Sequence, residues 1–484
     1  MMCGVLAFFD IRDDLTFAIG FAQNPRYFVA LHLKTLTVQL STPRASSFAR
    51  RVSGLFDHLL KVRTNKRMCG SIAEIYTFIT PWHDLQNLSM FEKKRVYLDY
   101  AAATPLSKAA FLAMEPYLRE VYGNPSAIHT EGMAGRRGVE EARDRVASTL
   151  QVKPEYVTFT SGGTESNNVA IFGTIEYLKS AGRAYSDMEV VTTALEHPSI
   201  LKAMDELVVR GVRVIFVPVD ERGLVKLETL QTLLTNKTVL FSVAYANSEI
   251  GTVQKVRAIK KTLEAVEKKF GTTILFHVDA AQAPLWLPCQ MELIHADLLA
   301  LDVGKCNGPK GVGVLVRHRR AKLTSALYGG GQESGLRPGT ENVAGVVGGS
   351  VALMEAQQGW KERAANVAKV RDAGIAHLTA QIEGSVLNGA VGDDRLANNI
   401  NISIPGLDTE FAAVVLDKHG FAVSTKSACA GTGGGESTVV KEISCDAARS
   451  RSTLRFSLSP DTTHKDIERL TEVLKVHIEK MSKY

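Results

Sequence analysis

A lysine at the end of an apolar run is the residue whose placement first suggests covalent chemistry. Lys305 follows the run Leu298–Leu301 and Asp302, and the turn Gly308–Gly311 comes directly after it. An amine in a desolvated pocket has a lowered pKa and can form a Schiff base with an aldehyde. A solvated loop charge is the alternative, and the local sequence does not choose between Lys305 and Lys310.

A glycine-rich junction offers a place for an anion. The stretch from residue 160 to residue 167 reads TSGGTESN and leads from a predicted strand into a predicted helix. Backbone N–H groups at Gly163 and the hydroxyl of Thr164 would lie at the helix N-terminus, where phosphate groups bind readily. Simple helix capping is the alternative for such a turn.

Two other predicted strand ends carry polar side chains. His197 precedes Pro198, a residue suited to the first turn of a helix. The imidazole can stack on a planar cofactor or move protons near neutral pH, or it can only cap the helix. Asn247 and Glu249 end another strand, where the amide can meet a polar ligand or serve the turn.

A carboxylate ends the predicted strand Ile274–Val278. Asp279 follows this strand directly, and Gln282 lies three residues further on, about one helical turn. A buried carboxylate is costly unless a cation pairs with it. A protonated ring nitrogen would be such a cation, and a structural salt bridge is the alternative.

The elements that position these residues alternate between strand and helix. Continuous apolar strands separated by helices predict an α/β fold with a largely parallel sheet covered on both faces. Ligands bind at the carboxyl ends of strands in such sheets. Strands are expected at Tyr156–Thr160, Glu189–Thr193, Val212–Val217, Val239–Tyr245, Ile274–Val278, Asp297–Leu301 and Gly313–Val316, with helices at Glu165–Ala181, Pro198–Arg210, Leu227–Leu234 and Val256–Phe270.

Three regions are expected along the chain. Residues 1–93 form an appended N-terminal segment of unknown role, poorly ordered, with Met90 as an alternative start. Residues 94–355 form the large domain, whose first residues can pack with the small domain. Residues 356–484 form a smaller α+β domain with strands near Asn399–Ile404 and Thr453–Ser457 and a last helix from His464.

Composition excludes several classes of protein. Residues 1–89 hold ten Lys or Arg and six Asp or Glu, so this segment accounts for +4 of the net charge of +6 and the main body for +2. That balance argues against nucleic acid as a partner. The six cysteines form no CxxC pair and no metal-ligand spacing, which argues against a metal site and favours a reducing cytoplasm. No apolar run reaches a membrane span.

Ten motifs occur in the order found in cysteine desulfurases, which the chain resembles from Arg95 to its C-terminus. The motifs are DYAAATP, GNPSAIH, SGGTESNN, LEHPSI, NSEIG, HVDAAQ, GKCNGPKG, YGGGQESGLRPGTEN, SACAG and LRFSLS. These enzymes belong to the class-V, fold-type I group that uses pyridoxal 5'-phosphate. The resemblance implies the fold-type I architecture, a large domain with a mostly parallel sheet and a smaller α+β domain.

The same resemblance assigns roles to individual residues. Lys305 would carry the cofactor as a Schiff base, Asp279 would pair with the pyridine nitrogen, and His197 would lie over the ring. Asn247 and Gln282 would lie near the ring's phenolic oxygen and the substrate. Gly163 and Thr164 would hold the phosphate, Thr340 would reach the phosphate of the neighbouring subunit in a homodimer, and Arg455 would bind the substrate carboxylate through its paired donors.

Cys429 matches the family's sulfur-accepting cysteine. Its surroundings fit this role, because the glycine-rich flank from Gly431 to Gly435 predicts a mobile loop and Lys426 favours the thiolate. A small buried hydrophobe is the alternative for a lone cysteine. Three other cysteines lack such flanks and are expected to be structural: Cys289, Cys306 and Cys445.

The chain also departs from the family's pattern. The family usually has a serine and a histidine ahead of the lysine that help to hold the phosphate, and this chain has Asp302 and Gly304.

The expected function is conversion of L-cysteine to L-alanine with transfer of sulfur to Cys429, and then to an iron–sulfur scaffold or sulfur carrier. The alternatives are a selenocysteine lyase or other class-V lyase or aminotransferase, and a non-catalytic scaffold that has lost the cofactor.

Overall fold

The computed structural model describes residues 8–11, 15–18, 95–425 and 435–481. The chain divides into two compact units, Met1–Met90 and Phe91–Tyr484. In the first unit, β1 (Phe8–Ile11) and β2 (Leu15–Ala18) pair as an antiparallel hairpin. Most of residues 1–93 lie outside the described residues. The expectation that they form an appended segment therefore stays a prediction.

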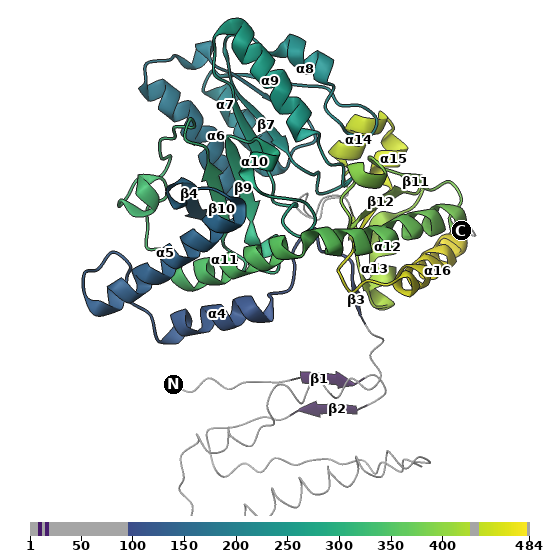
Figure 1. The fold of residues 1–484 in the computed structure, drawn as a ribbon. Coiled ribbons are helices and arrows are strands. Elements are labelled where there is room, and N and C mark those ends of the chain that lie inside the picture. Colours follow the sequence, from purple (N-terminus) through teal and green to yellow (C-terminus); the bar gives the residue numbers. More distant parts are fainter. Residues whose placement is uncertain (1–7, 12–14, 19–94, 426–434, 482–484) are drawn as a thin grey trace, which may run out of the picture. The chain divides into compact units, whose positions relative to one another are not determined.

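A seven-stranded sheet forms the centre of the second unit (Figure 1). Its strand order is β4-β10-β9-β8-β7-β5-β6. The strands are β4 (Val157–Thr160), β5 (Glu189–Thr192), β6 (Arg213–Phe216), β7 (Thr238–Ala244), β8 (Leu275–Asp279), β9 (Leu298–Asp302) and β10 (Gly313–Arg317). β10 pairs antiparallel with β4 and with β9, and all other neighbouring strands of this sheet pair in parallel. The predicted mostly parallel α/β sheet is therefore confirmed.

The sheet is apolar on both faces because adjacent residues of each strand point to opposite sides. On β7, Leu240 packs with α6 (Gly163–Ser180) and α7 (Pro198–Val209) in one buried cluster. Its neighbour Phe241 belongs to the other cluster and stacks on Phe276 at 5.9 Å between ring centroids. That second cluster also takes the apolar stripe of α9 (Val256–Phe270).

Three long helices pack against one another beside the sheet. They are α4 (Lys108–Arg119), α5 (Thr130–Leu150) and α11 (Val343–Gln358). Gly348 allows α11 to approach α4 closely, since a Cβ there would lie 2.3 Å from Met114 Cγ. The expected domain boundary at residue 355 lies within the last turns of α11, and α12 (Trp360–Gln381) begins directly after Gly359.

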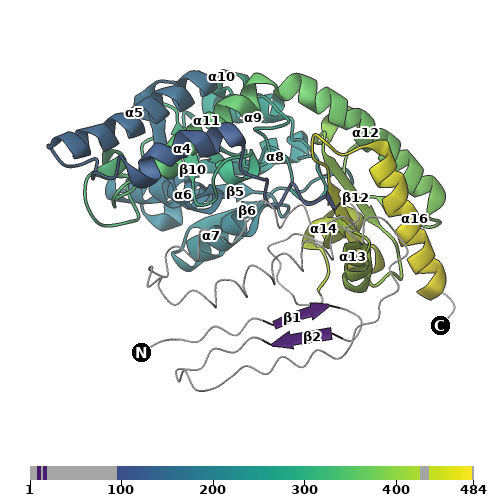
Figure 2. The same ribbon diagram turned by 90° about the horizontal axis from the view of Figure 1, so that it is seen from below.

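The C-terminal part forms a smaller antiparallel sheet of order β11-β12-β15-β14. Its strands are β11 (Val386–Leu387), β12 (Asn399–Ser403), β14 (Ser424–Thr425) and β15 (Thr453–Ser457). Helices α12 and α16 (His464–Met481) lie side by side along it, as Figure 2 shows from below, and α13 (Thr409–Lys418) packs on α16. The short strand β3 (Val96–Tyr97) pairs in parallel with β13 (Phe421–Ala422).

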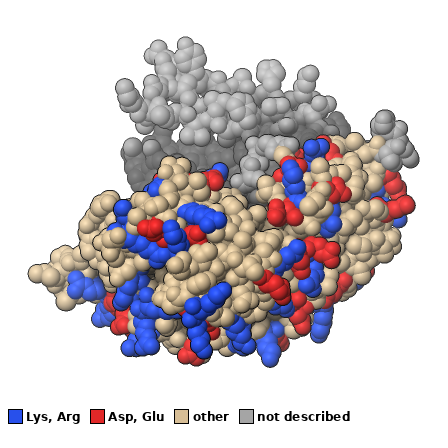
Figure 3. Space-filling model, turned by 90° about the horizontal axis from the view of Figure 1, so that it is seen from above, with Lys and Arg blue, Asp and Glu red and all other residues tan. Residues whose placement is uncertain are grey.

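Short helices complete the described chain. They are α8 (Leu227–Leu233), α10 (Met291–Ile294), α14 (Thr438–Ser444) and α15 (Ala447–Arg451), and the 3-10 helices η2 (Pro154–Tyr156), η3 (Tyr185–Asp187), η4 (Val303–Lys305), η5 (Gln332–Gly335) and η6 (Gly392–Asp394). Basic and acidic side chains are mixed on the face drawn in Figure 3. Within the described ranges, every helix is too short or too polar to cross a membrane.

Candidate active site

A cavity of about 300 Å³ opens at the carboxyl edge of the large sheet. Most of the lining residues lie at or shortly after the ends of β4, β5, β7, β8 and β9, because parallel strands bring these ends to one edge of the sheet. The cavity is lined by six of the residues predicted to form the site, namely Gly163, Thr164, His197, Asn247, Asp279 and Gln282, and by Lys305. The sequence thus predicted residues that the fold does bring together.

The structure distinguishes the two lysines that the sequence left open. Lys305 ends η4 and lines the cavity. Lys310 lies in the following turn, is exposed, and donates a hydrogen bond from its ammonium group to the carbonyl of Thr104. Of the two lysines, Lys305 is therefore the one that lines the cavity.

The carboxylate of Asp279 is held in place from two sides. Asn167 Nδ2 donates to Oδ2 at 2.9 Å, and the backbone N–H of Ala281 donates to Oδ1 at 2.9 Å. Asn167 lies on α6 and is only 1 % exposed. Asn167 lines the cavity, and its own Oδ1 has no hydrogen-bond partner among the described residues. A ligand that donates a hydrogen bond here would satisfy this buried oxygen.

The tautomer of His197 follows from its hydrogen bonds. The backbone N–H of Ser199 donates to His197 Nδ1 at 3.1 Å, and Ser199 Oγ lies 2.8 Å from the same nitrogen. Because an N–H group can only donate, Nδ1 carries no proton, and the neutral ring is protonated at Nε2. Burial, and then the charge of Lys305, lower the pKa of His197, which favours this neutral form. His197 is also the N-cap of α7, so the capping interpretation is confirmed, while its role toward a ligand stays a prediction.

Glu196 is a buried carboxyl that the sequence reasoning missed. Thr193 Oγ1 donates to Glu196 Oε1 at 2.6 Å, while Oε2 has no partner among the described residues. Burial raises the pKa of Glu196 to about 8, despite the hydrogen bond from Thr193, and nearby Asp279 adds to this rise. Glu196 therefore lines the cavity as a largely neutral acid at neutral pH.

The N-terminus of α6 forms one end of the cavity. Gly162 is its N-cap, with φ 152°, and no side chain caps the helix. The first-turn N–H groups at Gly163 and Thr164 therefore remain available to an anion. Asp302 also lines this cavity and accepts a hydrogen bond from the N–H of Gly304 at 3.0 Å.

The two predicted amide ligands are already engaged with backbone groups. Asn247 Oδ1 accepts from the N–H groups of Glu249 and Ile250, both at 2.9 Å, and its Nδ2 donates to Leu195 O at 2.8 Å. This is the turn role that the sequence left open, and it leaves one amide hydrogen of Asn247 for a ligand. Gln282 donates through Nε2 to Ala101 O at 2.8 Å.

Two predicted site residues do not line the cavity. Arg455 is 2 % exposed, and its guanidinium donates to Asp99 Oδ1 at 2.7 Å and to Ser248 O at 3.1 Å. Its Nε has no partner among the described residues. Thr340 is exposed outside the cavity. A substrate carboxylate would have to share Arg455 with Asp99.

The predicted sulfur acceptor, Cys429, lies outside the described residues. Of the cysteines expected to be structural, Cys289 and Cys306 are buried, and burial raises the pKa of both thiols. Cys445 is instead exposed, and it is the C-cap of α14 in the left-handed conformation with φ 53°. The structural role expected of Cys445 stays a prediction.

Three cavity residues that sequence reasoning did not assign are Asn167, Glu196 and Ser199. Each of them lies in a motif that the sequence did single out. Asn167 belongs to SGGTESNN, and Glu196 and Ser199 belong to LEHPSI together with His197. Their roles were not predictable, because the polar chain from Asp279 through Asn167 and Ser199 to His197 joins three separate elements.

Comparisons with known proteins identify the family to which this chain belongs. Residues 96–470 match the family model described as aminotransferase class-V. The cysteine desulfurase IscS of Dictyoglomus turgidum is 36% identical over 389 residues, covering 80% of this chain and 96% of that protein. Among solved structures, a NifS-like protein superposes with a TM-score of 0.72 at 31% identity, covering 80% of this chain and 99% of its own. A structure described as SspA in complex with cysteine gives 0.64 at 29% identity, with 75% and 99% covered.

The fold and the family match define the class of protein. The chain belongs to the aminotransferase class-V family, and its large and small sheets follow the fold-type I architecture. Within that family it is a cysteine desulfurase-like enzyme. The family implies pyridoxal phosphate as cofactor.

Proposed function

We propose that this enzyme uses pyridoxal phosphate to convert L-cysteine to L-alanine and transfers the sulfur to Cys429 as a persulfide. The observation that carries the proposal is the presence of Lys305 and the anchored carboxylate of Asp279 in one cavity. The similarity to proteins named cysteine desulfurase, and to one described with cysteine, supports the choice of substrate.

The lining residues fit this cofactor at its ring end. Asp279 would hold a protonated ring nitrogen, Lys305 would bond the aldehyde carbon, and His197 would lie against the ring. The uncapped N-terminus of α6 would take the phosphate through Gly163 and Thr164. The buried oxygens of Asn167 and Glu196 that lack described partners further support occupation by a polar ligand.

When bound, the cofactor supplies an electron sink for a negative charge at the substrate Cα. Lys305 Nζ would then take the Cα proton and return it to the product. Asp279 would keep the ring nitrogen protonated, and His197 Nε2–H would donate a hydrogen bond into the cavity. The Cys429 thiolate would bond the substrate sulfur as the Cβ–S bond breaks, and the remaining three carbons would take up a proton and leave as alanine.

The described ends of the Cys429 segment support its role. Thr425 ends β14, which pairs with β15 at the register Ser424↔Arg455. On the other side, Thr438 and Val439 of α14 line the cavity. Cys429 is four residues from Thr425, so an extended chain spans about 13–14 Å to it. The described ends on both sides of the segment therefore support a role for Cys429 at this cavity.

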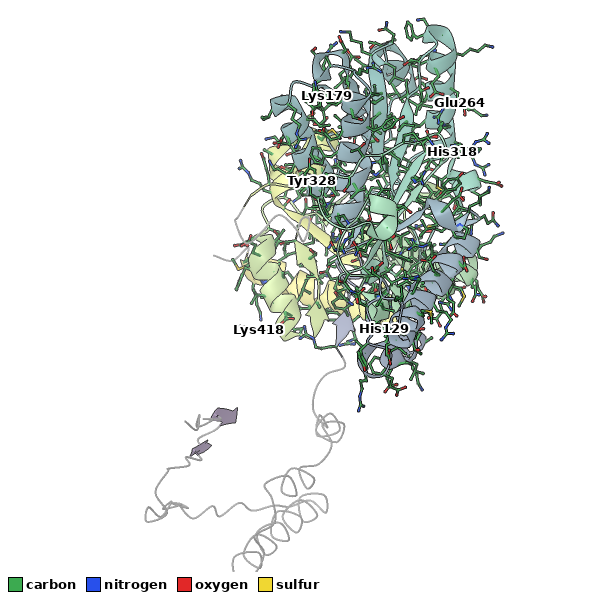
Figure 4. All side chains as sticks on the ribbon, turned by 90° about the vertical axis from the view of Figure 1, so that its left-hand side faces the viewer. His129, Lys179, Glu264, His318, Tyr328 and Lys418 are labelled. Atoms are coloured by element: carbon green, nitrogen blue, oxygen red, sulfur yellow. The ribbon has the colours of Figure 1, made fainter. Side chains whose placement is uncertain are left out.

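A homodimer belongs to this proposal, with Thr340 lent to the partner's phosphate site. Thr340 is exposed, as are large apolar side chains near the start of α5, with Tyr122 78 % and Ile128 89 % exposed. Figure 4 shows Tyr328 and His129, the N-cap of α5, on the outside of this unit. Light scattering of the full chain tests the dimer, and Thr340→Ala should weaken cofactor retention.

Cofactor binding and catalysis are tested separately. The purified protein should show an absorbance band at roughly 390–420 nm that Lys305→Ala abolishes. Alanine and persulfide formed from cysteine should disappear in Cys429→Ser but persist in Cys445→Ser, the exposed cysteine control. Absence of the band would favour a non-catalytic scaffold. Unchanged alanine release in Cys429→Ser would favour a selenocysteine lyase or another class-V lyase.

The acceptor of the sulfur would be an iron–sulfur scaffold or a sulfur-carrier protein. A reducing compartment such as the cytoplasm suits a reaction that passes through a free thiol. Incubation of the persulfide form with a purified scaffold and a purified carrier, each followed by mass, would distinguish the two.

A further inference from the structure

The residue that ends β9 lies at the anion-binding end of the cavity. Asp302 lines the cavity together with Gly163, Thr164 and Lys305. A Cβ built on Gly163, the first residue of α6, would lie 3.3 Å from Asp302 Cβ and 3.6 Å from its Oδ2. One carboxylate oxygen therefore faces the first turn of the helix that would receive the phosphate.

No described basic side chain forms an ion pair with this carboxylate, although Lys305 lines the same cavity. The other acidic side chain at this turn, Glu165, is paired with Arg337 at 3.2 Å. Asp302 makes no ion pair with any described residue, and its Oδ1 accepts a hydrogen bond from the N–H of Gly304. The charge of Asp302 is thus exposed to whatever occupies the end of α6.

We propose that Asp302 weakens the hold of this site on the cofactor phosphate, so that the aldehyde and ring contacts supply most of the affinity. This inference rests on the proposed function. A phosphate dianion and the Asp302 carboxylate would compete for the same helix N-terminus, and like charges a few ångströms apart repel strongly in a partly desolvated site.

The backbone of Gly304 lies next to the Asp302 carboxylate. A Cβ at residue 304 would lie 3.2 Å from Asp302 Oδ1 and 3.6 Å from Lys310 Cα. Any side chain at 304 would therefore press on the carboxylate and disturb its hydrogen bond with the residue-304 N–H. Residues 302 and 304 are consequently coupled, because a side chain at 304 requires the Asp302 carboxylate to shift by a few tenths of an ångström.

The test compares two aldehydes that differ only in the phosphate. The full chain is stripped of aldehyde with hydroxylamine, and binding of pyridoxal phosphate and of pyridoxal is titrated by absorbance. Asp302→Asn keeps an oxygen that accepts from Gly304 N–H but removes the charge. It should raise the affinity ratio of pyridoxal phosphate to pyridoxal by about tenfold or more. Asp446→Asn, at the exposed N-cap of α15, is the control and should leave the ratio unchanged.

A second set of variants tests the coupling. Gly304→His alone should lower the ratio, and Asp302→Ser combined with Gly304→His should raise it above that of the unmodified chain. A ratio that stays within about twofold in Asp302→Asn and in the double variant would overturn the inference, while a Lys305-dependent band would leave the proposed function intact. Absence of that band in every variant would overturn both.

Discussion

Asn167 Nδ2 lies 2.9 Å from Asp279 Oδ2 and donates its hydrogen to that carboxylate. The second hydrogen of the same amide goes to Ser199 Oγ, also at 2.9 Å. The orientation of the amide is fixed, because a flipped amide would turn its oxygen toward the carboxylate. A side chain on α6 thus connects the end of β8 to the start of α7.

Asn167→Ala should lower kcat/KM for cysteine by about 10- to 100-fold, since a hydrogen bond to a charged group contributes roughly 1.5–3 kcal/mol. Asp279 would lose a fixed donor and its alignment with the ring. Steady-state alanine release measures the effect, with Asn236→Ala in an exposed loop as control. Equal rates in the two variants would show that Asn167 does not position Asp279.

Ser199→Ala should raise the pKa of His197. The Ser199 hydroxyl receives the hydrogen of Asn167, so its own hydrogen goes to His197 Nδ1 and stabilises the neutral ring. Removal of that donor makes protonation easier. Histidine NMR across pH 4–8, roughly the range around the ordinary pKa, follows the shift. Ser180→Ala, at the exposed end of α6, should leave His197 unchanged, and a His197 pKa that falls or stays constant in Ser199→Ala would contradict the assignment.

Glu196→Gln should make the protein more stable in mildly alkaline solution. The folded pKa of about 8 lies above the unfolded value near 4.5, so the folded state binds the extra proton between these values. Stability is therefore lost as the pH rises from about 4.5 through 8. Glutamine keeps the oxygen that accepts from Thr193 and cannot ionise. Urea unfolding measures the free energy of unfolding of both proteins at about pH 6 and pH 8. From the lower to the higher pH, the difference between the variant and the unmodified chain should shift by a few kcal/mol in favour of the variant. The same difference at both pH values would refute a neutral Glu196.

Glu333→Gln should destabilise the fold by about 3 kcal/mol. Glu333 is buried and accepts two hydrogen bonds from Arg143, at 2.8 and 2.9 Å, and one from Phe159 N–H at 2.8 Å. These bonds hold a segment whose residues 333 and 334 have positive φ angles of 50° and 56°. Glu140→Gln is the matched control, because this side chain also pairs with Arg143 but is 58% exposed. Comparable losses in both variants would contradict the assigned role.

The sequence by itself determined the fold class and most of the elements. The α9 helix begins and ends where its apolar period predicts, at Val256 and Phe270, and β5 and β7 agree within one residue at each end. These patterns are local consequences of burial. The order of polar residues after each strand also predicted a common site, because parallel strands bring their carboxyl ends to one edge.

Tertiary structure alone decided which of these residues meet and what else they contact. Lys305 and Lys310 have similar local sequences, and only the course of η4 places the first in the cavity and the second on the carbonyl of Thr104. The pairing of Asp279 with Asn167 spans 112 positions of the chain. Hydrogen bonds and charge repulsion depend on distances of a few ångströms, and a sequence pattern does not contain distances between elements that are remote along the chain.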